Sequence, residues 1–261
     1  MKLSIITINY NNKEGLKETI DSVMTQTTRE FEWIIIDGGS IDGSKELIED
    51  HSEYISYFVS ESDNGIYNAM NKGIAASHGD YIQFLNSGDA LYEKDTLEKV
   101  LPCLKNKDIY VGKIISRGKS NESTAIQSDF SPESILDKLT FTWIPHQASF
   151  FKSSIFIQYG LYREDQKIVS DWWFFFRSLV IGNASIDSLP YTIAYYDTNG
   201  ISHTLRSQAI IEQDSLLNEY PAISTYYHFY KDNKDIVKAL KANKLSFLLF
   251  RFYYFIYRKF H

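Results

Sequence analysis

The first hundred residues alternate short β-branched runs with stretches of helical periodicity, and this alternation constrains the fold more than any other feature. Strands are predicted over residues 3–8, 33–36, 57–59 and 81–85. Apolar residues recur at helical spacing between them: Leu16, Ile20 and Val23, and then Ile66, Met70 and Ile74. Further along, helices are predicted near residues 95–104 and 132–139, with a strand near 109–115. The order is typical of βαβ units around a mainly parallel sheet, so an α/β fold is expected.

Polar side chains follow each predicted strand, in residues 9–12, 37–44, 63–72 and 86–89. Because the carboxyl ends of parallel strands meet at one sheet edge, where helix N-termini also converge, we expect a ligand site there. The glycine-rich residues 38–45 do not form a phosphate-binding P-loop, since Ser44 stands where that motif needs lysine. The dinucleotide motif G-x-G-x-x-G is also missing. A plain turn, with Asp42 at the start of a helix, remains the alternative for this segment.

Composition restricts the class of protein. With 261 residues, 44% hydrophobic and 23% charged, the chain can bury a core, and collagen-like or disordered classes are excluded. Its single cysteine, Cys103, excludes an internal disulfide framework and a multi-cysteine zinc site. A reducing, cytoplasmic location is therefore expected. The N-terminal apolar run leads directly into the first strand, so no signal peptide is predicted.

The C-terminal segment is basic and aromatic. Residues 226–261 hold eight Lys/Arg against two Asp/Glu, so they carry +6 and the remainder −12. The acidic body disfavours nucleic acid as a partner. The apolar run at 246–257 is too short to span a bilayer and contains Arg251. Aromatic rings flanked by cations favour peripheral attachment to an anionic membrane, whereas packing on the catalytic lobe or at a dimer interface is the alternative.

Four segments in order resemble the family 2 glycosyltransferases of the GT-A fold, over about residues 3–205. They are SIITINYNN (4–12), IIDGGSIDG (35–43), DNGIYNAMNKG (63–73) and GDYIQFLNSGD (79–89). The last two are similar to bacterial enzymes of exopolysaccharide, capsule and O-antigen synthesis (colanic-acid type). The resemblance implies a Rossmann-like, mainly parallel mixed sheet flanked by helices. It further implies a catalytic domain at 1–222, with a nucleotide-binding half (about 1–105) and an acceptor half (about 106–222), followed by a helical tail at 223–261.

The same resemblance implies an inverting transfer of sugar from a nucleoside diphosphate donor, UDP-linked in the first instance, with GDP- and dTDP-sugars left open. The acceptor would be a lipid-linked or growing glycan at the inner face of the cytoplasmic membrane. Two alternatives stay open: a sugar nucleotidyltransferase, whose basic glycine-rich loop is missing here, and a non-catalytic membrane-associated scaffold with a degenerate donor site. The oligomeric state has no signal in the sequence.

Nucleotide-binding positions follow from the resemblance. They are Thr7, Asn9, Asp37, Asp63, Lys72 and Asn86. Asp37 and Asp63 would accept hydrogen bonds from the base and ribose. Lys72 would approach a phosphate or orient Asp63, and its alternative is a solvated helix residue.

Metal binding in this family normally uses a D-x-D motif that holds Mn²⁺ or Mg²⁺. Here the corresponding run ends in Asp89, its single carboxylate, and begins with Asn86, a neutral oxygen ligand or ribose contact. His203 is a candidate further ligand, and a surface polar role is its alternative.

For inversion, a general base must remove the proton of the acceptor hydroxyl, and Asp171 matches the family's acid before an apolar helix. Its alternative role is a helix N-cap. Sugar or acceptor contacts are predicted for His146, Trp172 and Trp173, with backbone-satisfied and core roles as alternatives. Tyr67, Arg163 and Arg177 are further candidates.

Overall fold

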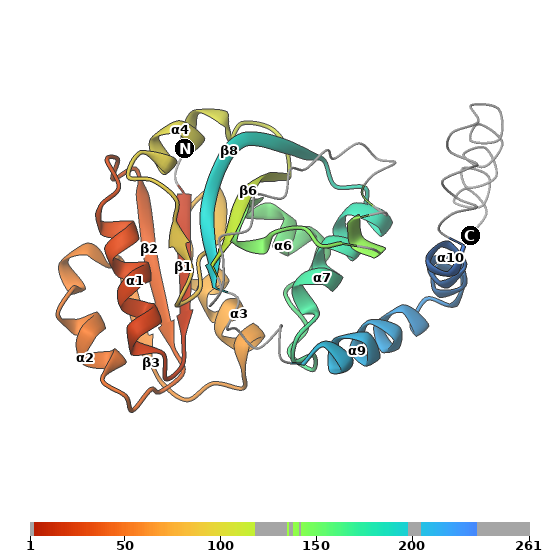
Figure 1. Cartoon of the computed structure of the whole chain (residues 1–261), viewed down its shortest axis with the longest axis horizontal. Helices are drawn as coiled ribbons and strands as arrows, with labels where there is room; N and C mark the ends of the chain where they lie inside the picture. Colours follow the sequence, from red (N-terminus) through yellow and green to blue (C-terminus); the bar gives the residue numbers. More distant parts are fainter. Residues whose placement is uncertain (1–2, 118–134, 136–137, 141, 198–204, 234–261) are drawn as a thin grey trace. The chain divides into compact units, whose positions relative to one another are not determined.

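The first strand of the chain, β1 (Leu3–Asn9), is buried along its whole length inside a sheet in the computed structural model (Figure 1). The structure describes residues 3–117, 135, 138–140, 142–197 and 205–233. Strands β2 (Phe31–Asp37) and β4 (Tyr81–Phe84) run parallel to β1 on either side, and β3 (Tyr57–Ser60) runs parallel to β2. The predicted strands and their parallel arrangement are confirmed.

The second half of the sheet is mixed. Strand β7 (Ser149–Lys152) is antiparallel to β4, and β6 (Ile109–Arg117) is antiparallel to β7. Strand β8 (Ile186–Asp197) runs parallel to β6, and the short β5 (Ala90–Leu91) pairs antiparallel with β8. The order across the eight described strands is β3-β2-β1-β4-β7-β6-β8-β5. Because β5 and β8 lie far apart in the chain, their pairing brings the end of β8 to the residues that follow β4.

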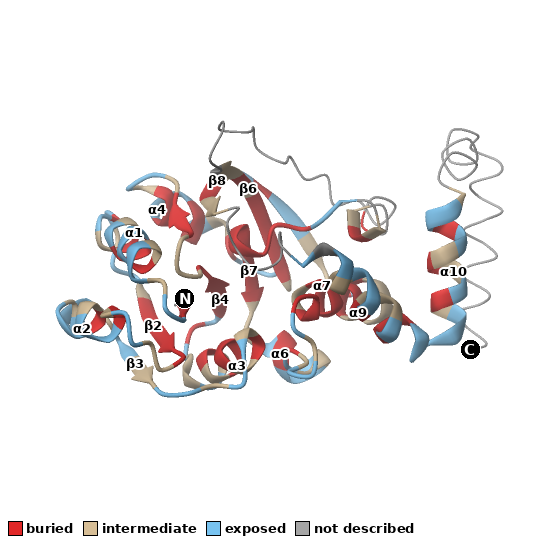
Figure 2. Ribbon diagram, turned by 60° about the horizontal axis from the view of Figure 1, so that its bottom comes forward, coloured by how far each residue is buried: buried red, intermediate tan, exposed pale blue. Residues whose placement is uncertain are grey.

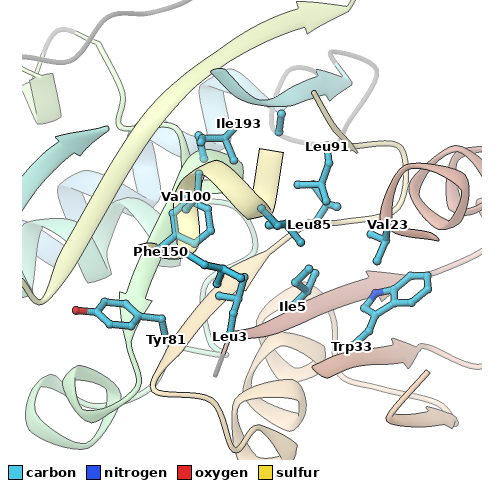
Figure 3. Packing of buried hydrophobic residues seen from close by; sticks show 14 of the residues in the cluster. Leu3, Ile5, Val23, Trp33, Tyr81, Leu85, Leu91, Val100, Phe150 and Ile193 are labelled. Atoms are coloured by element: carbon cyan, nitrogen blue, oxygen red, sulfur yellow. The ribbon is translucent and has the colours of Figure 1, made fainter. Parts of the chain in front are cut away.

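One face of the sheet packs on α1 (Lys13–Met24) and α4 (Thr96–Val100). Residues at alternate positions of β1 and β2 belong to this core, since neighbouring strand residues point to opposite faces. Figure 3 shows Trp33 beside Val23 of α1, with Leu3 and Ile5 in the same cluster. The predicted face of α1 is confirmed, because its apolar residues at helical spacing are all buried.

The other face is covered by α3 (Ile66–Ala76), which contacts β1 and β2. A Cβ on Gly73 would lie 2.4 Å from Ile6 Cγ2, so glycine permits the close approach of helix and strand. The prediction for this helix was partly wrong. Ile66 and Ile74 are only partly buried, whereas Tyr67 and Asn71 are buried because their polar groups have partners in the protein.

The remaining helices lie between strands in the chain or follow the last strand, β8. They are α2 (Ser44–Glu49), α6 (Ser154–Tyr159), α7 (Ser170–Phe175), a π-helix (Phe176–Ile181), α9 (Arg206–Asn218) and α10 (Pro221–Asp232), with 3-10 turns at Ser52–Tyr54, Leu101–Cys103 and His146–Ala148. Figure 2 shows β2, β4 and β7 as buried, while much of α2 is exposed. The helix predicted near 95–104 is confirmed as α4 and its 3-10 extension. The one predicted near 132–139 lies largely outside the described residues.

The chain divides into two compact units between Gln213 and Asp214, within α9. Most of the predicted tail, residues 223–261, lies outside the described part of the chain. Within that described part, no helix is both long and apolar enough to cross a membrane.

Candidate active site

A cavity of about 870 Å³ opens at the carboxyl ends of β1 and β4, which is the edge predicted from the sequence. Its size is typical of a small-molecule site. The start of α3, the turn before β7, the segment that enters α7 and the end of β8 complete its walls. It brings together six of the predicted residues: Asn9, Asp63, Asn86, Asp89, His146 and Asp171.

Asp37 lies beneath this cavity and does not line it. It is fully buried and pairs in register with Asn9, whose Nδ2 donates to Asp37 Oδ1 at 2.8 Å. The hydroxyls of Ser40 and Ser60 also donate to this carboxylate. Burial alone would raise the pKa of Asp37, but the hydrogen bonds from Ser40, Ser60 and Asn9 outweigh it and hold the pKa below its ordinary value. The carboxyl group of Asp37 is therefore charged, and it holds the side chain of Asn9, which lines the cavity.

Two other predicted nucleotide residues also lie outside the cavity lining. The buried Thr7 hydroxyl accepts a hydrogen bond from Trp33 Nε1 at 3.0 Å. Lys72 Nζ lies 2.7 Å from Glu61 Oε1, in a separate cavity of about 480 Å³. Among the predicted nucleotide residues, Asp63, Asn9 and Asn86 remain as direct wall residues.

Asp63 precedes α3 and lies on the cavity wall beside Gly38. Its Oδ1 accepts the backbone N–H of Gly65 at 2.8 Å. A Cβ on Gly38 would lie 2.7 Å from Asp63 Oδ2, so only glycine leaves room for this carboxylate in its position. The glycine-rich turn thus places its backbone against the Asp63 carboxylate. This contact gives no support to a P-loop or to a dinucleotide-binding motif.

Asp89 meets a second carboxylate, that of Asp197 at the end of β8. Asp89 is 4% exposed, and its Oδ1 accepts the Asp197 backbone N–H at 3.0 Å. Burial raises the pKa of Asp89 to about 8; the nearby Asp197 carboxylate adds to the rise, and hydrogen bonds from the Asp197 backbone and the Gln147 side chain oppose it. Asp197 was not predicted as a site residue, because only the pairing of β5 with β8 brings it to Asp89.

The residues around Asp89 fit a divalent cation. Among the described residues, the buried oxygens Asn86 Oδ1 and Gln147 Oε1 have no hydrogen-bond partner, and both residues line the cavity. Together with the carboxylates of Asp89 and Asp197 they form a set of oxygen donors, which Mg²⁺ and Mn²⁺ prefer. A cation there would also favour the ionised form of Asp89. The described residues contain no cluster of three or more His, Cys, Asp or Glu suited to a metal, and His203 lies outside them.

Carboxyl groups outnumber cations on the wall of this cavity. Its described residues include Asp63, Asp89, Asp171 and Asp197, against one ammonium, Lys167, and one imidazole, His146. With its pKa raised to about 8, Asp89 carries its charge at neutral pH when a cation lies beside it, and such a cation would favour an anionic ligand in the cavity.

Asp171 is the second residue of α7, and Val169 is the N-cap, so the alternative N-cap role for Asp171 is wrong. The Tyr67 hydroxyl lies 3.0 Å from Asp171 Oδ1 and 2.6 Å from the Ile168 carbonyl oxygen. Asp171 lies on the cavity wall together with Tyr67 and Asp89. This carboxylate can accept a proton from a ligand that occupies the cavity.

His146 is buried, and its Nε2 lies 2.8 Å from the Tyr162 hydroxyl. Its ring stacks on Phe84 with a centroid distance of 4.9 Å. Burial lowers the pKa of His146, against a smaller opposing effect of Asp171. The hydrogen-bond partner of this imidazole is therefore the Tyr162 side chain, whereas the alternative prediction was a backbone group.

Trp172 and Trp173 lie in an aromatic cluster and do not line the cavity. Trp172 Nε1 donates to the Leu139 carbonyl at 2.8 Å, and Trp173 stacks on Phe176. Their position matches the alternative core role. Arg163 pairs with Asp165 at 2.6 Å and Arg177 donates to the Gly160 carbonyl, and neither arginine lines the cavity.

A sequence profile described as Glycosyl transferase family 2 matches residues 4–164, more than half of the chain. The chain belongs to this family. This family 2 chain is 30% identical over 220 residues to an uncharacterized glycosyltransferase of Mycobacterium tuberculosis, covering 80% of the chain and 79% of the relative. It is 28% identical over 218 residues to a PGL/p-HBAD biosynthesis glycosyltransferase of Mycobacterium bovis, covering 80% and 82%. The predicted enzyme class, a glycosyltransferase, is confirmed.

Solved structures of low identity share the fold of this family 2 chain. Staphylococcus aureus TarS (residues 1–349) in complex with UDP-GlcNAc aligns with a TM-score of 0.64 at 18% identity, over 78% of this chain and 60% of TarS. A mannosyltransferase of Pyrobaculum calidifontis in complex with GDP-Man and Mn²⁺ aligns at 0.62 and 15% identity, over 97% and 79%. This chain thus spans about three fifths of the aligned TarS chain. The predicted GT-A fold is confirmed, and the colanic-acid resemblance stays a prediction.

Proposed function

We propose that this protein is an inverting glycosyltransferase that moves a sugar from a nucleoside diphosphate donor, UDP-linked in the first instance, to a lipid-linked or growing glycan of a bacterial surface polysaccharide. One observation carries the proposal. Asp63, Asp89 and Asp171 come from three separate segments and line a single cavity at the carboxyl ends of the strands. Such an edge is where α/β folds bind nucleotides.

The donor's nucleoside would lie against Asp63 and Asn9, above the buried Asp37. A carboxylate there can accept hydrogen bonds from ribose hydroxyls and from an N–H of the base. The structural relatives that bind UDP, UDP-GlcNAc and GDP-Man support a nucleotide sugar as ligand class. UDP is the first candidate, and the choice among nucleotides is left to the binding test below.

The diphosphate would lie near Asp89 and Asp197, with a divalent cation held by these carboxylates and by Asn86. When bound, Mn²⁺ or Mg²⁺ supplies positive charge that stabilises the leaving diphosphate. The Mn²⁺ complex of the Pyrobaculum mannosyltransferase supports this assignment. The acidic wall described above supports it independently, because its carboxyl groups outnumber its one lysine and a cation would offset their repulsion of a diphosphate.

Asp171 would act as the general base. The acceptor hydroxyl oxygen attacks the anomeric carbon, and the bond from that carbon to the diphosphate oxygen breaks with its electron pair. The hydroxyl proton passes to the Asp171 carboxylate. Attack and departure on opposite faces invert the anomeric centre, and a positioned base of this kind contributes about 10²- to 10⁴-fold to the rate.

The acceptor and its location rest on the sequence of the tail. Its basic and aromatic residues favour peripheral contact with an anionic membrane, where lipid-linked acceptors are found.

Calorimetric titration of UDP, GDP and dTDP into the full-length protein, each with and without Mn²⁺, tests this proposal first. We expect Mn²⁺-dependent binding of one nucleotide, UDP before the others. Nucleotide release is then measured from the matching sugar donors. If no nucleotide binds in either condition, the transferase proposal fails and the non-catalytic scaffold takes its place.

A further inference from the structure

Helix α3 holds the segment that leads to the proposed base. Asn71 Nδ2 donates to the Tyr162 carbonyl at 2.9 Å, and Asn71 Oδ1 accepts the Tyr162 N–H at 3.1 Å. Asn68 Nδ2 and Asn71 Nδ2 both donate to the Glu164 carboxylate at 2.8 Å. This side of α3 therefore faces protein, although the sequence motif that contains it resembles a donor-site motif.

Tyr67 continues this contact one helical turn earlier, and its hydroxyl reaches the start of α7. The oxygen lies 2.6 Å from the Ile168 carbonyl and 3.0 Å from Asp171 Oδ1. Asp171 is the second residue of α7. Tyr67 thus ties the beginning of α7 to α3 through one backbone carbonyl and the carboxylate of Asp171.

The hydroxyl of Tyr67 remains a proton donor over the working pH range. Its side chain is buried, and burial followed by the charge of Asp171 raises the pKa of Tyr67 well above its usual value. The one hydroxyl proton has two acceptors, the Asp171 carboxylate and the Ile168 carbonyl. When Asp171 takes up a proton, the Tyr67 hydroxyl can donate to Ile168, so no buried donor loses its partner.

We propose that Tyr67 is a positioning residue, which fixes the Asp171 carboxylate toward the acceptor through the hydrogen bond from its hydroxyl to Oδ1. The inference rests on the proposed function, since it assumes that Asp171 is the base. With Oδ1 bound to Tyr67, Oδ2 is the oxygen that takes the acceptor's proton. In the described part of the chain, two titratable side chains besides Tyr67 interact electrostatically with Asp171, namely His146 and Tyr162.

The substitution Tyr67→Phe tests this role, because it removes the hydroxyl and keeps the ring that packs near Tyr162. Tyr81→Phe is the matched control. Tyr81 is also buried, and its hydroxyl lies 2.7 Å from a backbone carbonyl, that of Lys107, away from the cavity. The full-length variants are compared by Mn²⁺-dependent UDP binding and by UDP release from UDP-GlcNAc, UDP-glucose and UDP-galactose as a function of pH. GDP-mannose replaces these donors if the wild-type protein binds GDP.

In Tyr67→Phe we expect kcat to fall about 10- to 100-fold, as expected for a displaced catalytic group, with donor KM and UDP affinity unchanged. The acid limb of the pH–rate profile should move to higher pH, since a carboxylate without this donor holds its proton more tightly. Tyr81→Phe should keep the wild-type kcat and profile. In an Asp171→Asn background, Tyr67→Phe should cause no further loss, because the two residues act as a unit.

A wild-type kcat and acid limb in Tyr67→Phe would overturn the positioning role while leaving the transferase proposal in place. Equal losses in Tyr67→Phe and Tyr81→Phe would overturn it as well, because they would indicate a general effect of a missing buried hydroxyl. If the wild-type protein binds no nucleotide and releases none from any donor, the proposed function itself fails.

Discussion

Asp89 Oδ1 accepts a hydrogen bond from the backbone N–H of Asp197 at 3.0 Å, across a separation of 108 residues in the chain. This contact joins the loop after β4 to the end of β8, and it brings a second carboxylate to a motif that contains a single one. A cation site that looks depleted in the sequence therefore gains an acidic residue from a distant strand.

The substitution Asp89→Asn tests the cation site. The amide retains an oxygen that can accept the Asp197 N–H, so we expect the fold to persist while the charge is lost. The Mn²⁺-dependent part of UDP affinity, measured by calorimetry, should fall by at least about 10- to 100-fold. Asp42→Asn is the control, since Asp42 binds Ser44 and the backbone of Lys13 outside the cavity. Unchanged Mn²⁺ dependence in the Asp89 variant would remove Asp89 from the ligand set.

Replacement of Asp171 by asparagine tests the general base. The amide cannot take up the acceptor's proton, so kcat should fall by about 10²- to 10⁴-fold. The affinity for UDP with Mn²⁺ should stay close to that of the wild type. Loss of nucleotide binding in this variant would contradict the assignment and make Asp171 part of the donor site.

His146 predicts a pH dependence of stability. Because burial lowers the pKa of His146 in the folded protein, the unfolded chain, with an ordinary pKa of about 6.5, binds a proton that the folded chain does not. This contribution to stability is complete above that pH and is lost as the pH falls below it. The melting temperature should therefore fall from pH 7.5 to 5, and His146→Gln should flatten this slope. Equal slopes in the wild type and in His146→Gln would refute the prediction.

Gly73 leaves no room for a larger side chain between α3 and β1. A methyl group in Gly73→Ala would lie 2.4 Å from Ile6 Cγ2, so we expect a loss of about 1–3 kcal/mol in the free energy of unfolding, measured in urea. In the double variant with Ile6→Ala, the new methyl group enters the space that the Ile6 side chain leaves. The combined loss should then be smaller than the sum of the two single losses. Strict additivity would show that the two positions do not share this contact.

Deletion of residues 245–261 tests the membrane role of the tail. We expect weaker flotation with anionic phosphatidylglycerol vesicles and unchanged binding of UDP, because the donor cavity is lined by residues before 198. Flotation equal to that of the full-length chain would favour the alternative in which the tail packs on protein.

The first half of the fold could be predicted because its signals are local. Buried strands such as β1 and the regular apolar spacing of α1 are visible within a dozen residues. The buried face of α3 was harder to predict, because Tyr67 and Asn71 are buried with hydrogen bonds that apolar periodicity cannot reveal. In the same way, helical spacing alone does not show that Trp172 and Trp173 both belong to the core.

The same distinction between local and long-range signals holds for the residues of the candidate site. Asp63, Asp89 and Asp171 follow strands or begin helices, where carboxylates are informative in sequence. Asp197 and Gln147 gave no such signal, because their position depends on strand pairings between distant parts of the chain. Asp37 and Thr7 were predicted at the correct strand ends, but they do not line the cavity, and their side chains form hydrogen bonds within the protein.

The paired hydrogen bonds between Asn71 and Tyr162 have a consequence for protein engineering. They join α3 to the segment before α7, so the predicted nucleotide-binding and acceptor halves would not be interchangeable modules. A chimera that imports the acceptor half of another transferase would have to import compatible residues at 67, 68 and 71 with it. Without them, we expect the transplanted segment to fold but to lie in the wrong position relative to the donor site.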